Sequence, residues 1–126
     1  MALTTRYRLQ TLTARSNTLA DKMQDETFAY TDSTTGTEWV SHEIKMAGGA
    51  SSSKAINFGG VTVARTLLVR SPVNLRLLFN SGTTQIPMRV LTDSVAVLYM
   101  HCSATALTVI KTPAASALIS VRILGT

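Results

Sequence analysis

The second half of the chain alternates between apolar and polar positions with a period of two. Val73, Leu75, Leu77 and Phe79 are separated by polar residues, and only Leu78 breaks the pattern. Successive side chains on a β-strand point to opposite faces, so this alternation is typical of a strand with one buried face. The pattern therefore predicts β-structure.

Similar short runs recur about every ten residues, with turn-forming residues between them. This rhythm predicts an all-β protein, an antiparallel β-sandwich or jelly-roll-like domain with an N-terminal arm or short helix. Pro87 cannot donate to a strand ladder, so its run is expected to form an edge strand or a bulge. Strands are predicted at residues 38–46, 54–58, 62–70, 73–80, 84–91, 95–100, 106–111 and 117–124.

Glycine- and serine-rich stretches predict the breaks between strands. Residues 31–36 have the composition of a turn, and residues 47–53 that of a flexible loop tip. Gly59 and Gly60 indicate a bend or bulge. The apolar residues expected to face inward are Val73, Leu75, Leu77, Phe79, Ile86, Met88, Val90, Ile119, Val121 and Ile123.

The N-terminal segment has a different and weaker pattern. Residues at three- and four-residue spacing, namely Leu9, Leu12, Ser16, Leu19 and Met23, are compatible with a short helix capped by Ser16 or Asn17. Threonines at five positions before residue 20 lower the helix propensity, which favours an extended arm ordered only against a neighbour. We expect an arm or short helix over residues 1–27 and a β-sandwich domain over residues 28–126.

The composition fits one domain without disulfide bonds. The chain has 126 residues, of which 45% are hydrophobic and only 15% are charged. Cys102 is the single cysteine, so no intramolecular disulfide is possible. Low charge leaves little to solvate the surface, which suggests that copies of the chain or a partner cover part of it. No apolar run of membrane-spanning length or signal-peptide core is visible, so we expect a soluble protein made in a cytosol.

The net charge of +5 is distributed unevenly along the chain. Residues 1–63 hold six basic and six acidic groups, whereas residues 64–126 hold six basic groups and only Asp93. The basic residues occur singly within strands, and Phe79 and Tyr99 are the only aromatic residues there that could stack on bases. Nucleic-acid binding is therefore not expected, and charges that face water or an interface are favoured. The basic residues are Arg65, Arg70, Arg76, Arg89, Lys111 and Arg122.

Two histidines and the cysteine are the natural candidates for metal binding. His101 and Cys102 are adjacent and point to opposite faces of a strand, so they cannot jointly hold one metal in the usual way. His42 shares the apolar face of its strand with Ile44, and Glu38 lies four residues earlier on that face. A Glu–His site would need further ligands, for which the sequence gives no spacing.

A hydrolase would require a nucleophile, a base and an orienting acid. Asp93, His101, Cys102 and many serines are present, but no Gly-x-Ser-x-Gly elbow occurs. The glycine pair at residues 59–60 precedes a predicted strand and is no phosphate-binding loop. We therefore predict that the chain is not an enzyme, with no catalytic, cofactor-binding or metal-binding residues and no cofactor.

Five segments follow one another in a fixed order of strands and turns, namely ARTLLVRS (64–71), VNLRLLF (73–79), IPMRVL (86–91), VAVL (95–98) and ALISVRIL (117–124). In this order the chain resembles small β-proteins encoded among the structural genes of tailed bacteriophages. The resemblance covers about residues 55–125. The chain departs from the group's pattern at Thr92-Asp93-Ser94, where Pro-Gly-Glu is usual, and at Ser71, where Asn is usual.

The resemblance implies a virion structural protein, first of all a capsid cement or decoration protein that binds and stabilises the outer shell. It also implies a homo-oligomer, a trimer as in many decoration proteins, with the major capsid protein as partner and the virion, assembled in the bacterial cytoplasm, as location. The alternatives are a tail or head-tail accessory protein and a carbohydrate- or host-surface-binding module. For the last, Trp39 is the best candidate for stacking on a sugar.

Overall fold

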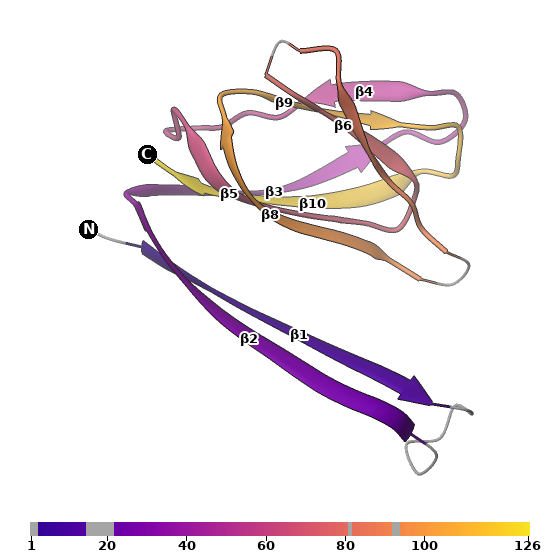
Figure 1. Ribbon diagram of the computed structural model, residues 1–126. Coiled ribbons are helices and arrows are strands. Elements are labelled where there is room, and N and C mark those ends of the chain that lie inside the picture. The colour runs from indigo at the N-terminus through magenta and orange to yellow at the C-terminus, as the bar shows by residue number, and fades with distance from the viewer. Residues whose placement is uncertain (1–2, 15–21, 81, 92–93) are drawn as a thin grey trace. The chain divides into compact units, whose positions relative to one another are not determined.

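The computed structural model describes residues 3–14, 22–80, 82–91 and 94–126, with side chains described after Thr35 (Figure 1). The described residues form β-strands and no helix, so the all-β prediction is confirmed. The described backbone divides into one unit that ends at Thr35 and another from Gly36 to Thr126. Among these residues there is no helix long and apolar enough to cross a membrane.

The N-terminal unit is a two-stranded sheet of β1 (Leu3–Ala14) and β2 (Lys22–Gly36), whose strands run antiparallel in Figure 1. The short-helix alternative is wrong for these residues, because the β-branched threonines that lower helix propensity favour extended backbone. Its predicted caps, Ser16 and Asn17, lie outside the described residues. The extended alternative agrees with the backbone.

The predicted turn at residues 31–36 is also wrong, because β2 continues through this stretch to Gly36. Its run of threonines and serine has turn-like polarity but also strand propensity, and pairing with β1 decides between the two. The unit boundary at Thr35 lies later than the division between residues 27 and 28 that was expected.

The second unit contains two four-stranded antiparallel sheets. Sheet I has the order β3-β10-β5-β8, and sheet II the order β4-β9-β6-β7. A strand lies at each predicted position, with ends shifted by a few residues. The strands are β3 (Glu38–Met46), β4 (Ser52–Ala55), β5 (Ala64–Ser71), β6 (Leu75–Phe79), β7 (Gln85–Met88), β8 (Ala96–Ala104), β9 (Leu107–Lys111) and β10 (Ala117–Gly125).

The pairing pattern of the eight strands is that of a jelly roll. The first four strands pair with the last four in reverse order, as β3 with β10, β4 with β9, β5 with β8 and β6 with β7. Every connection except that between β6 and β7 crosses from one sheet to the other. This antiparallel double ribbon, wrapped into two facing sheets, is the jelly-roll topology (Figure 1).

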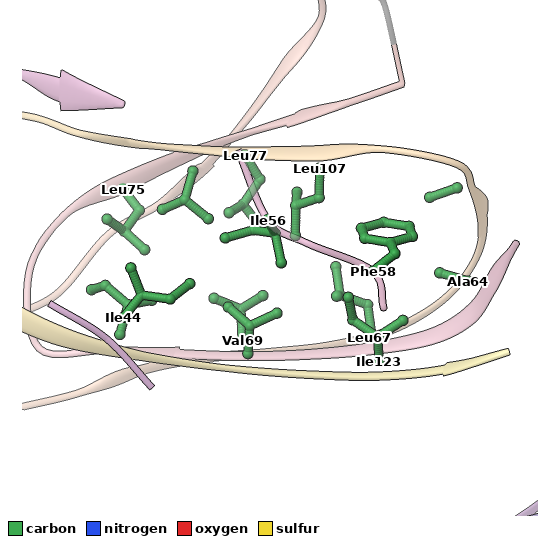
Figure 2. Close-up of a cluster of buried hydrophobic side chains, with 14 of the residues drawn as sticks. Ile44, Ile56, Phe58, Ala64, Leu67, Val69, Leu75, Leu77, Leu107 and Ile123 are labelled. Carbon is green, nitrogen blue, oxygen red and sulfur yellow. The ribbon is translucent and has the colours of Figure 1, made fainter. Parts of the chain in front are cut away.

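The core lies between the two sheets, where side chains from both inner faces meet (Figure 2). Six of the ten residues predicted to face inward are buried, and Val73, Phe79 and Ile86 are partly buried against the same cluster. Val90 does not belong to the cluster, because β7 ends at Met88, before the predicted strand end. The six buried residues are Leu75, Leu77, Met88, Ile119, Val121 and Ile123.

Gly59 lies in a turn and Pro87 in an edge strand, as the sequence indicated, whereas the glycine- and serine-rich loop is shorter than predicted. Gly59 has a φ of 57° in a turn closed by a 2.9 Å bond from the Val61 N–H to the Phe58 carbonyl oxygen. Pro87 lies in β7, an edge strand of sheet II. The predicted loop over residues 47–53 is too long, because β4 begins at Ser52.

Candidate binding surface

His42 supports a loop of the sandwich. Its side chain is partly buried on the same face of β3 as Ile44, as predicted, and Nε2 lies 2.6 Å from the Asn57 carbonyl oxygen. Glu38 is exposed at the start of the strand. The described part of the chain contains no group of three or more His, Cys, Asp or Glu side chains that could hold a metal ion.

His101 and Cys102 point to opposite sides of β8, as predicted. His101 is exposed, and its ring meets that of Tyr99 edge to face at 5.9 Å. Cys102 is partly buried, and its thiol donates to the Ala64 carbonyl oxygen over 3.5 Å. Burial raises the pKa of the Cys102 thiol, partly offset by a backbone hydrogen bond from Ala104. The thiol is therefore protonated at neutral pH, which disfavours nucleophilic chemistry. Asp93 lies outside the described residues.

Lys111 is a buried lysine. The sequence analysis had wrongly expected it to face outward with the other basic residues. Its side chain is fully buried, and the ammonium group donates to the carbonyl oxygens of Thr112 at 3.3 Å and Ala114 at 3.2 Å. Its register partner Ser52 carries a buried hydroxyl oxygen with no hydrogen-bond partner among the described residues. Lys111 thus holds the turn after β9 to the interior of the sandwich.

The arginines of the sandwich face solvent and are spread over both sheets. All five of them are exposed, which agrees with the expectation for isolated strand charges. Arg70 and Arg122 project from sheet I, whereas Arg76 projects from sheet II.

The outer face of sheet I is the part of the described surface richest in exposed apolar side chains. Trp39 on β3 is 64% exposed, Leu118 on β10 is 55% exposed and Val97 on β8 is 58% exposed. Val95, just before β8, and Leu91 are also exposed. The outer face of sheet I is therefore the candidate contact surface of the described residues.

A shallow hollow of about 230 Å³ lies on this outer face, near Leu118 at the start of β10. Ser120 forms its centre and has Glu43 as register partner on one side and Arg70 on the other. The Ser120 hydroxyl donates to the Glu43 carboxylate, whose two oxygens lie 2.9 and 3.0 Å away. The lining residues are Glu43, Arg70, Pro72, Val95, Leu118 and Ser120.

The hollow combines a carboxylate, a hydroxyl and a guanidinium with an apolar rim. No protein family model, curated protein or solved structure matches this chain. The hydroxyl, carboxylate and guanidinium of the hollow can form hydrogen bonds and ion pairs with polar groups of another molecule. Sequence reasoning did not find this site, because it brings together residues of three strands whose register the sequence does not reveal.

Proposed function

We propose that this chain is a virion structural protein of a tailed bacteriophage, a cement or decoration protein that binds the outer shell of the capsid. The main support is a compact jelly roll preceded by a long β-hairpin. Jelly rolls occur in viral capsid proteins, lectins and cupins, so the fold alone is only an analogy. The observation that supports an assembly role most directly is the length of the hairpin strands.

The hairpin is too long to be covered by one sheet of its own sandwich. β2 has 15 residues and spans about 50 Å, whereas the longest sandwich strands have nine residues and span about 30 Å. An isolated two-stranded hairpin is marginally stable in water. A strand of this length exceeds what one sandwich sheet could cover, and we propose that a neighbouring subunit or the capsid shell covers the remainder.

Surface composition supports a role in assembly. Only 15% of the residues are charged, against about 25% in typical soluble domains. The exposed apolar residues of sheet I provide a surface that contact with another molecule would cover. We propose that the hairpin joins copies of the chain into a homo-oligomer, a trimer as in the decoration proteins that the chain resembles, with the major capsid protein as the second partner.

A carbohydrate- or host-surface-binding module is the second candidate, because Trp39 offers a largely exposed indole on a sheet face. Sugar rings stack on such aromatic surfaces. If this alternative held, the purified protein would bind glycans or host cells, and Trp39→Ala would abolish that binding. Binding to shells with no affinity for glycans favours the cement role.

Deletion of residues 1–35 tests the cement role. We expect the remaining sandwich to give the β-type circular dichroism spectrum of the intact protein, but to co-sediment with capsid shells at least about tenfold more weakly, because the hairpin contact is lost. Binding to isolated tails instead of shells would move the assignment to the tail accessory alternative. A truncated protein that binds shells with full affinity, or an intact protein that binds none, contradicts the proposal.

A further inference from the structure

We propose that the hollow on sheet I is half of a twofold interface between two copies of this chain, in which Glu43 of each copy pairs with Arg70 of the other. The contact goes beyond the shell-binding role and does not depend on it. Three features of the described surface carry it, namely the charges beside Ser120, the symmetry of the strand order and the apolar rim.

Glu43 and Arg70 stand on the two strands that flank β10, each about 5 Å from Ser120 across the sheet. The Glu43 carboxylate accepts one hydroxyl hydrogen bond and keeps free acceptor capacity. Arg70 is exposed and forms no hydrogen bond or ion pair with any part of the chain that the structure describes. The face therefore presents one carboxylate and one unpaired guanidinium on opposite sides of a small residue.

Strand order makes this charge pair self-complementary. A twofold axis that runs along β10, between two packed faces, exchanges β3 with β5 in the second copy. Glu43 of each copy then lies opposite Arg70 of the other, so one contact forms two ion pairs. Guanidinium and carboxylate groups match in geometry, and partial burial strengthens each pair.

Apolar side chains surround the charges and provide contact area. Leu118 lies on the proposed axis and would meet its own counterpart, while Pro72 and Val95 form the rim. With the axis along β10, the outer faces of β3, β10 and β5 of the two copies overlap, whereas β8 lies outside the contact. Three strands about 4.8 Å apart and eight or nine residues long give roughly 400 Å² per copy. The total of about 800 Å² is that of a weak, reversible contact, so dimerisation is expected only at high protein concentration.

Arg122 restricts where the two faces meet. It follows Ser120 on the outer side of β10, so the axis would bring the two Arg122 side chains toward each other. Packed sheets cross at about 30° and diverge away from the crossing point. The contact is therefore centred at the Leu118 end of the strand, which is the end that holds the hollow.

Charge exchange between the two positions tests the interface in sedimentation velocity runs on the full chain. We expect Glu43→Arg and Arg70→Glu each to weaken dimerisation at least about tenfold, because each creates like-charge contacts. The double variant should restore the dimer. An equimolar mixture of the two single variants should form a heterodimer, since every facing pair is then opposite in charge.

Two control variants make the same changes of charge at exposed positions outside the proposed interface. Glu38→Arg changes an exposed carboxylate on the same strand, and Arg76→Glu changes an exposed arginine on sheet II. Both should dimerise like the unmodified chain, and all variants should keep its thermal midpoint. A monomeric unmodified chain at about 200 μM, or single variants that dimerise normally, would overturn the interface. A dimer with no affinity for capsid shells would uphold the interface and count only against the cement role.

Discussion

Lys111 is the only charged side chain that is buried in the part of the sandwich that the structure describes. Its aliphatic stem packs in the interior, and its ammonium group reaches the backbone oxygens of the following turn. A buried charge is retained only when it is well hydrogen-bonded, so the turn after β9 depends on this residue.

Replacement of Lys111 by alanine is expected to lower the free energy of unfolding by about 2–4 kcal/mol, because it leaves a cavity and frees two carbonyl oxygens. Lys111→Met keeps most of the volume and should cost clearly less. Urea unfolding of both variants measures the difference. A loss below about 0.5 kcal/mol for the alanine variant would mean that Lys111 is not part of the packed interior.

Cys102 predicts a specific effect of alkaline pH. Burial raises the pKa of the folded thiol, so above about pH 8.5 the unfolded chain ionises this group before the folded chain does. The contribution of Cys102 to stability is therefore complete below that pH and is lost as the pH rises toward the folded pKa. Unfolding free energies measured from pH 7 to 10 should fall less steeply for Cys102→Ala than for the unmodified chain. Parallel curves would contradict the assignment.

At the scale of elements, the hairpin and the sandwich should differ in local stability. β10 is hydrogen-bonded on both sides within sheet I, whereas β1 and β2 pair only with each other. Amide exchange in the free protein should therefore be slowest in β10 and fast in β1 and β2.

Contact with a shell or a neighbouring subunit should slow amide exchange in β1 and β2 and leave β10 nearly unchanged. This selective gain of protection is the measurable sign of hairpin docking. A hairpin that is as protected as β10 in the dilute free protein would show that it needs no docking surface.

Strand positions in the sandwich followed from the sequence because alternation reports directly which face of a strand is buried. Leu107 and Val109 alternate toward the core, and the same alternation extended by two residues would have placed Lys111 inside as well. The N-terminal segment was harder to interpret, because a few leucines at helical spacing competed with threonines that favour strands. The pairing of strands within each sheet was not predictable. Ser120 and Glu43, for example, are hydrogen-bonded on neighbouring strands but lie 77 residues apart in the sequence.

At the scale of the whole molecule, the chain carries two proposed contact elements, the hairpin and the outer face of sheet I. The hairpin is suited to partners outside the domain, and the outer face of sheet I is suited to a second copy. The two proposed contacts involve different residues, so each has its own test variants. This separation allows the proposed shell binding and the proposed dimer to be tested independently.

The central claim is that the chain is a structural component of a phage shell, present in many copies. Quantitative mass spectrometry of virus particles purified from cells that produce the chain tests it most directly, with the major capsid protein as internal reference. The account predicts a molar ratio near one, as expected for a protein that covers the shell. A few copies per particle would favour a tail component, and particles that lack the chain would contradict the virion assignment altogether.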